Sequence, residues 1–297
     1  GTSRHAALLA QHYFTEVCSF TTVQVVDATD FSASRLPKRG KTVAVLISQS
    51  GETRDLAKLI PVLDERDIPT IGVVNVVGSL IARSVDCGVY CNAGREVAVA
   101  STKSFTSQVV SLVLIALWFS QKHECFEGKR ARIIASLRKL PGDIRTTLIK
   151  WADARQIAER LAGCASCFVL GKDASFASAL EGALKIKEIS GIHAEGSLCG
   201  SLKHGPFGLL SVSMPVILLG ARDDPLIEST FQEIKSRGSP IVVVGPRDNS
   251  DFRLPHSEFF GHVLAVVFLQ MVSYHLATSK GMDPDYPRNL AKVVTTD

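Results

Sequence analysis

Short apolar runs, rich in valine and isoleucine, alternate along the chain with longer stretches whose apolar residues recur at helical spacing. The runs predict strands at residues 23–26, 42–47, 70–74, 88–91, 167–170, 215–219 and 240–244. The longer stretches predict helices near residues 6–17, 52–65, 79–84, 101–120, 179–188 and 259–278, and one that ends at 234. Short strands that alternate with helices are typical of a doubly wound parallel sheet, so an α/β fold is expected.

The order of elements occurs twice, which predicts two tandem doubly wound domains of the flavodoxin-like type. We expect a first domain at residues 1–140, a second at 141–280 and a C-terminal tail at 281–297. The chain opens on a Gly1-Thr2-Ser3 turn, and in a parallel sheet such a turn normally follows a strand. The first domain is therefore expected to lack its first strand, and the chain to be the downstream part of a longer polypeptide.

Composition narrows the classes of function. The 297 residues are 46% hydrophobic and 21% charged, with a net charge of +4, which is ordinary for a soluble globular protein. No basic block interleaved with aromatic residues indicates nucleic-acid binding, and the slight positive charge suits a small anionic substrate. The longest apolar run, residues 109–119, is too short to span a bilayer, and no signal peptide opens the chain. A cytoplasmic protein without a membrane partner is therefore expected.

Seven scattered cysteines predict reduced thiols rather than a disulfide framework. Cys164 and Cys167 form a CxxC pair, but no second pair stands at the spacing of a zinc site. The pair runs directly into an apolar strand. Small buried side chains are therefore expected there, rather than a metal or redox site.

The helix predicted at residues 179–188 carries the densest candidate chemistry. Glu181, Lys185 and Glu188 fall on one stripe of about 60°, and most of the remaining circumference is Ala, Leu and Ile. A helix that is apolar nearly all round is buried, and buried charges must be paired or used. A predicted loop after the stripe adds further titratable residues: His193, Glu195, Lys203 and His204. This density favours a proton-transfer site over the alternative, an i,i+4 ion pair on a surface face.

Hydroxyl-rich turns form a second cluster. Residues 48–53, SQSGET, lie where a predicted strand ends and a helix begins, so free N–H groups and the helix dipole favour an anion. The alternative is a capping box that needs no ligand. Similar turns at Gly1-Thr2-Ser3 and Ser101-Thr102-Lys103 are expected at the same sheet edge, where ligands of parallel sheets bind. Three such turns favour a phosphate site, and the absence of a GxxxxGKS or GxxxxGKT motif excludes a nucleoside-triphosphate P-loop.

Five motifs occur together, in order: SQSGET at 48–53, VASTKSFTSQ at 99–108, LEGALKIKEIS at 180–190, LKHGP at 202–206 and PRNLAK at 287–292. With these motifs the chain resembles, over essentially its whole length, the isomerase portion of the glutamine–fructose-6-phosphate aminotransferases (glucosamine-6-phosphate synthases). That portion is built from two sugar isomerase (SIS) domains. The resemblance implies conversion of fructose 6-phosphate to glucosamine 6-phosphate by ketose–aldose isomerisation, with ammonia from a glutaminase domain outside this chain.

The same resemblance implies a site for the sugar phosphate, which is fructose, glucosamine or glucose 6-phosphate. It places the phosphate on residues of the SQSGET turn, with two serines nearby: Ser48, Gln49, Ser50 and Thr53, then Ser3 and Ser101. No cofactor and no metal are expected, because the carbonyl of the substrate itself accepts the electrons.

Catalytic roles are also implied by the resemblance. Glu188 matches the base that moves a proton between C1 and C2, and Lys185 assists it. Lys292 matches the tail lysine that forms an imine with the ketose, although from the residues alone it would be a solvated lysine. His204 matches a histidine that helps to open the sugar ring and comes from the neighbouring subunit, so a homodimer or a larger assembly with a shared active site is expected.

The chain departs from the family pattern at Ser201, where an acidic residue usually precedes LKHGP, and at residues 293–297, VVTTD in place of SVTVE. Two alternatives stay open. A glucosamine-6-phosphate deaminase of the same superfamily needs no glutaminase domain. A non-catalytic sugar-phosphate-binding SIS protein is the other alternative, against which the presence of Glu188, His204 and Lys292 argues.

Overall fold

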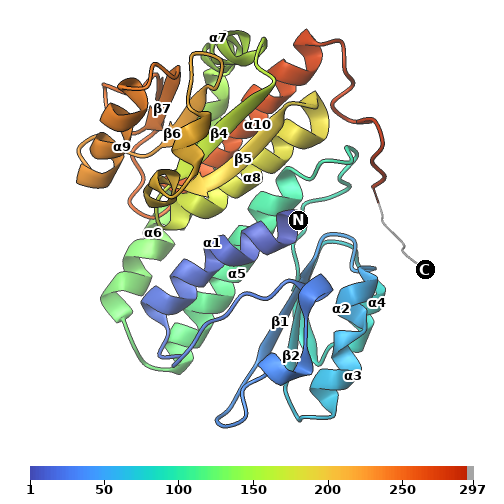
Figure 1. Cartoon of the computed structure of the whole chain (residues 1–297). Helices are drawn as coiled ribbons and strands as arrows, with labels where there is room; N and C mark the ends of the chain where they lie inside the picture. Colours follow the sequence, from blue (N-terminus) through green and yellow to red (C-terminus); the bar gives the residue numbers. More distant parts are fainter. Residues whose placement is uncertain (293–297) are drawn as a thin grey trace. The chain divides into compact units, whose positions relative to one another are not determined.

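The computed structural model describes residues 1–292, and the chain divides into two compact units (Figure 1). Unit 1 comprises Gly1–Glu127 together with the tail from Ala291, and unit 2 comprises Gly128–Leu290. Each unit contains its own parallel β-sheet. The predicted α/β fold with parallel sheets is therefore confirmed. The tail residues 293–297, where the sequence departs from the family pattern, lie outside the described residues.

Unit 1 is built on three parallel strands in the order β1-β2-β3. These are β1 Ala44–Ser48, β2 Thr70–Val74 and β3 Cys87–Tyr90. Its helices are α1 Thr2–Val17, α2 Arg54–Ala57, α3 Leu59–Asp64, α4 Leu80–Ser84 and α5 Lys103–Lys122, with short 3-10 turns at Ala28–Asp30 and Ala33–Arg35. In Figure 1, α1 and α5 lie together on one side of the strands, and α2, α3 and α4 lie on the other.

Alternation along the strands explains these two layers. On one face Leu46 and Val74 pack with Ile60 and Ile81 from the short helices. The other face meets α1 and α5, whose apolar sides are buried. Successive strand residues point to opposite faces, so a strand covered on both sides is apolar throughout.

The prediction of a strand at residues 23–26 is wrong. This segment has no regular secondary structure, and among the described residues β1 pairs with β2 alone. Its carbonyl at Val23 instead accepts a hydrogen bond from Gln11 Nε2 at 2.7 Å. An apolar, β-branched run forms a strand only where a neighbouring strand offers a ladder, so the local preference is not realised here.

Unit 2 has five parallel strands in the order β5-β4-β6-β7-β8. These are β4 Ser166–Gly171, β5 His193–Leu198, β6 Val216–Leu219, β7 Ile241–Gly245 and β8 Phe252–Arg253. Its helices are α6 Glu127–Ile149, which begins at the unit boundary, then α7 Trp151–Leu161, α8 Ala174–Ser190, α9 Pro225–Lys235 and α10 Gly261–Ser279, with 3-10 turns at Cys199–Lys203 and Pro206–Leu209. Pro141 and Gly142 lie inside the continuous helix α6.

Residues 193–198 were expected to be a loop, and that expectation is wrong, because they form the edge strand β5. The sequence HAEGSL has no apolar run, so no strand signal is visible in it. The strand is held by its ladder with β4 and by close packing on α8. A Cβ added at Gly196 would lie 2.7 Å from the Cα of Leu180, so the glycine permits this approach.

Among residues 1–292, two helices, α5 and α10, are long and apolar enough to cross a membrane by length and composition alone. Most of each helix is buried inside its own unit, as for the core helix of a globular fold. In unit 2, α10 packs closely against α8, and Leu269 fills the position that a Cβ on Gly182 would need. Helix α8 thus packs between α10 on one side and the strands β4 and β5 on the other. The buried charged residues of α8 lie in this packed layer.

Candidate functional site

The SQSGET turn joins the end of β1 to helix α2, and its own hydroxyls organise it. Ser48 Oγ lies 2.7 Å from Thr53 Oγ1 and accepts a hydrogen bond from the Gly51 N–H at 3.0 Å. Ser50 Oγ accepts one from the Glu52 N–H at 3.1 Å. Gly51 has a φ of +68°, and the side chain of Ser79 occupies the space that a Cβ would take. The turn therefore requires glycine and is held in one conformation before any ligand binds.

A cavity of about 820 Å³ opens at this turn, within unit 1. Its lining includes all six residues expected around the phosphate, together with the tail lysine: Ser3, Ser48, Gln49, Ser50, Thr53, Ser101 and Lys292. Ser3 stands in the first turn of α1, where backbone N–H groups have no helical partner, and its Oγ accepts a hydrogen bond from Gln108 Nε2 at 3.0 Å. Small polar groups and a helix N-terminus thus converge on one space, which suits an anion.

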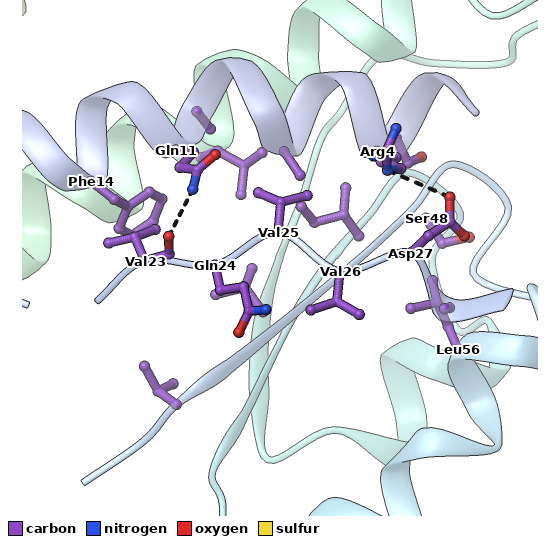
Figure 2. A pocket seen from close by; sticks show the side chains of 18 of the residues that line it. Arg4, Gln11, Phe14, Val23, Gln24, Val25, Val26, Asp27, Ser48 and Leu56 are labelled. Carbon is purple, nitrogen blue, oxygen red and sulfur yellow. Dashed lines mark hydrogen bonds and ion pairs between the residues drawn. The ribbon is translucent and has the colours of Figure 1, made fainter. Parts of the chain in front are cut away.

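The lining of the same cavity becomes more apolar with distance from Ser48, and Figure 2 shows the valines of the segment 23–26 there. Away from Ser48 it is lined by valines of the segment 23–26 and by Val45 and Ile47 of β1. Arg4 also lines it and pairs with Asp27 across 3.6 Å. Arg4 is a cation near the serine turn that the motif-based reasoning missed, although it directly follows the Gly1-Thr2-Ser3 turn. The serine turn, with its hydroxyl groups, is the part of the cavity that suits a phosphate.

Lys292 is anchored within unit 1. Its Nζ donates to the carbonyl of Ala98 at 2.6 Å and to that of Val99 at 3.4 Å, and the residue is half-buried. The alternative of a solvated lysine does not describe this geometry. The amine is held by two backbone carbonyls two and three residues before Ser101, so it stands beside the turn expected to contact the phosphate.

A buried carboxylate supports that same turn. Glu96 accepts hydrogen bonds from the Ser104 N–H at 2.9 Å and from Thr102 Oγ1 at 3.2 Å, at the start of α5. Burial raises the pKa of Glu96, but the hydrogen bonds from Ser104 and Thr102 and the charge of Lys292 outweigh it, so its pKa lies below the usual value. Sequence reasoning missed this residue because a single glutamate in a loop carries no motif.

In unit 2, helix α8 brings three charged side chains into one cluster. Lys185 Nζ lies 2.6 Å from Glu188 Oε2 and 3.4 Å from Glu181 Oε1. The Lys185 and Glu181 side chains are 2% and 0% exposed, so the surface-pair alternative is wrong, whereas the Glu188 side chain keeps 22% of its surface accessible. Glu188 is therefore the most accessible member of the cluster, and Lys185 is the cation that pairs with it.

The histidines expected in the loop after α8 are separated. His193 begins β5 and lies 2.9 Å from Ser166 Oγ, whereas His204 follows the 3-10 turn after the end of that strand. The six residues of β5 put about 17 Å between its ends. His204 is exposed, and its neighbour Lys203 pairs with Glu233 at 2.6 Å. His204 thus lies at the carboxyl side of the strands, and His193 and Glu195 do not belong to the same group.

The two cysteines of the CxxC pair differ. Cys167 is buried in β4, and Cys164 is half-buried before it. The hydrogen bond between the thiols lowers the pKa of Cys164 to about 7, whereas this bond and burial raise that of Cys167. Within residues 1–292, no group of three or more His, Cys, Asp or Glu side chains could hold a metal ion.

Unit 1 combines a parallel β-sheet, covered by helices, with a hydroxyl-rich turn at the carboxyl end of β1. These features are those of an α/β protein that binds a small anion at the end of its strands. The SIS domain model matches residues 1–118 and 160–252, more than half of the chain, and the chain therefore belongs to the SIS domain family.

Similar proteins narrow the relationship. The chain is 42% identical over its whole length to a probable glutamine–fructose-6-phosphate aminotransferase (isomerizing) of Acanthamoeba polyphaga mimivirus, covering 50% of that protein. It is 40% identical to glutamine–fructose-6-phosphate aminotransferase (isomerizing) 2 of Homo sapiens, covering 45% of it. The chain thus spans about half the length of the curated relatives it matches.

Solved structures agree with this relationship. The C-terminal domain of glucosamine-fructose-6-phosphate aminotransferase from Francisella tularensis superimposes with a TM-score of 0.89 at 30% identity, covering 97% of this chain and 85% of that one. A glucosamine-6-phosphate deaminase from Thermotoga maritima gives a TM-score of 0.81 at 24% identity, covering 99% and 88%. The second likeness shows the fold alone.

Proposed function

We propose that this chain is the isomerase portion of a glutamine–fructose-6-phosphate aminotransferase, in which fructose 6-phosphate and ammonia give glucosamine 6-phosphate. The observation that carries the proposal is that the serine turn, Ser3, Ser101 and Lys292 all line one cavity. Relatives that are named glutamine–fructose-6-phosphate aminotransferases, 36–42% identical over the whole chain, support it. We further propose that unit 1 and unit 2 each correspond to one SIS domain, followed by an active-site tail.

The proposed phosphate site uses elementary electrostatics. Ser48, Ser50 and Thr53 offer hydroxyl donors at the end of β1, and Gln49 adds an amide. The first turn of α1, next to Ser3, adds backbone N–H groups and the positive end of a helix dipole. When the phosphate of fructose 6-phosphate is bound at this turn, the sugar carbons lie outside the turn, where other residues can reach them.

The proposed chemistry needs one amine and one carboxylate. Lys292 attacks C2 of the open-chain ketose and forms an imine with loss of water, which makes the C1 hydrogens acidic. Ammonia then displaces the Lys292 amine from C2, so that the lysine is released and the imine nitrogen is that of ammonia. Glu188 takes a proton from C1 and returns it at C2, which leaves an amine on C2 and an aldehyde at C1. Lys185 holds Glu188 through the 2.6 Å ion pair, which favours the carboxylate form needed to accept a proton. His204, from a neighbouring subunit, assists ring opening, so the proposed active form is at least a homodimer in the cytoplasm.

Isomerisation of fructose 6-phosphate to glucose 6-phosphate, assayed with a coupled dehydrogenase, tests the proposal. Glu188→Gln should reduce turnover by at least a hundredfold and leave KM within about threefold, because the base acts on carbon rather than in binding. Glu195→Gln is the matched control, because Glu195 is an exposed carboxylate on β5 of the same unit. Near-normal turnover of the Glu188→Gln variant would contradict the base assignment.

The alternative function, a glucosamine-6-phosphate deaminase, predicts a different product, ammonia. A deaminase releases ammonia from glucosamine 6-phosphate without glutamine, so incubation with this sugar and an ammonia assay distinguishes it from the proposed function. A non-catalytic sensor would bind the sugar phosphate and give neither product.

A further inference from the structure

Glu96 is a buried carboxylate that the proposed chemistry does not use. It lies five residues before Ser101, in the connection between β3 and α5, and only 8% of it is exposed. A buried charge is costly unless hydrogen bonds or an opposite charge compensate it. Its partners therefore indicate what the carboxylate does.

Both carboxylate oxygens of Glu96 accept hydrogen bonds from residues at the start of α5. Oε1 accepts from Thr102 Oγ1 at 3.2 Å, and Oε2 accepts from the Ser104 N–H at 2.9 Å. These two contacts flank Lys103 and follow directly on Ser101. The two hydrogen bonds thus close the segment 96–104 from its first residue and restrain Ser101, which precedes Thr102 directly.

The closed segment also carries the contacts of Lys292. The carbonyls of Ala98 and Val99 that receive Lys292 Nζ lie between Glu96 and Ser101 in the chain. Lys292 also acts electrostatically on Glu96. The other charged side chains next to this carboxylate along the chain, Arg95 and Lys103, are exposed. One buried carboxylate therefore connects the phosphate-side serine with the amine.

We infer that Glu96 is a positioning residue: it fixes the segment 96–104 so that Ser101 and the amine of Lys292 have a set separation in the active site. This inference rests on the proposed function, because it assigns a role to the geometry around Lys292. It adds a residue that acts through others and does not touch the substrate.

The negative charge of Glu96 has a second consequence. It favours the ammonium form of Lys292, whereas imine formation requires the neutral amine. Removing the charge while keeping the shape should therefore have two opposite effects. The amine becomes available at lower pH, and its placement becomes less precise.

Reductive trapping measures both effects. The Lys292 amine and the ketose carbonyl form a C=N bond with loss of water, and borohydride then delivers hydride to carbon while nitrogen takes a proton from water. The secondary amine is detected as added mass on the peptide that contains Lys292. The full chain is incubated with fructose 6-phosphate at a series of pH values, and initial trapping rates are recorded.

Three variants sharpen the test. Glu96→Gln keeps the size and one acceptor oxygen, Glu96→Asp keeps the charge, and Asp86→Asn is the matched control. Asp86 accepts hydrogen bonds from the Thr70 N–H and hydroxyl, both at 2.7 Å, at the amino end of β2. It thus has the same kind of partners as Glu96 at the opposite end of the strands, although its side chain is exposed and that of Glu96 is buried.

Glu96→Gln should lower the maximal trapping rate about tenfold and move the pH midpoint about half a unit lower. Glu96→Asp should keep the wild-type midpoint and recover part of the rate, and Asp86→Asn should change neither. A rate loss with an unmoved midpoint, or equal losses in Glu96→Gln and Asp86→Asn, would reduce Glu96 to a structural residue and overturn the inference. Absence of trapping in the wild-type chain would instead refute the proposed function.

Discussion

The charged cluster on α8 yields a prediction whose size follows from the structure. Lys185→Met removes the ammonium that stands 2.6 Å from Glu188 and 3.4 Å from Glu181. At an effective dielectric constant of about 20, these distances correspond to attractions of about 6 and about 5 kcal/mol. The desolvation of the buried charges offsets much of this, so the sum is an upper limit.

Truncating one partner of a buried ion pair costs about 3–5 kcal/mol, because the remaining charge is left unpaired. Here the Glu181 side chain is fully buried, and that of Glu188 is 22% exposed, so solvent screens part of the loss. We therefore expect Lys185→Met to lower the free energy of unfolding of unit 2 by about 3 kcal/mol. With a urea m-value of about 2 kcal/mol/M, the midpoint falls by about 1.5 M.

Tryptophan fluorescence in urea measures this change. Trp151 belongs to unit 2 and Trp118 to unit 1, so a Trp118→Phe background leaves a reporter for unit 2 alone. Lys187→Met is the control, because Lys187 is exposed on the same helix. A change below about 1 kcal/mol, or one equal to that of the control, would refute the reasoning about the buried cluster.

Three further predictions concern unit 1. Ser48→Ala should raise the dissociation constant for fructose 6-phosphate about tenfold in calorimetry, because a donor of the serine turn and its contacts with Thr53 and Gly51 are lost; unchanged affinity would contradict the phosphate site. Gly51→Ala should lower the free energy of unfolding by about 1–3 kcal/mol, because of its positive φ and the adjacent Ser79 side chain; wild-type stability in urea would contradict it. Because the pKa of Glu96 is lowered by folding, its contribution is present above pH of about 4.3 and is lost as the pH falls through the folded value; Glu96→Gln should flatten this acid limb in thermal melts, and an unchanged limb would contradict it.

The fold follows from the sequence where one signal is strong and local. Strands such as β2 and β7 are short β-branched runs, and the structure confirms the predictions at 70–74 and 240–244 within a residue. Helices α5 and α10 agree with the predictions at 101–120 and 259–278 within two residues. In these elements the local preference and the burial in the fold agree, which is why periodicity is enough.

The errors arise where a partner decides the outcome. Residues 23–26 have the composition of a strand but no ladder, and residues 193–198 have a ladder but no apolar run. The candidate site shows the same division. The stripe on α8 is visible in the sequence because helical spacing is fixed, whereas Glu96 and Arg4 acquire significance only when the chain brings them to Lys292 and to the serine turn.

The most direct measurement of the central claim is solvent-deuterium exchange into fructose 6-phosphate, followed by proton NMR at C1. The account predicts stereospecific incorporation of one deuterium at C1 by the wild-type chain, and loss of this exchange in both Glu188→Gln and Lys292→Met while the sugar phosphate still binds. Exchange that persists in either variant would contradict the assignment of the carboxylate and the amine to one reaction.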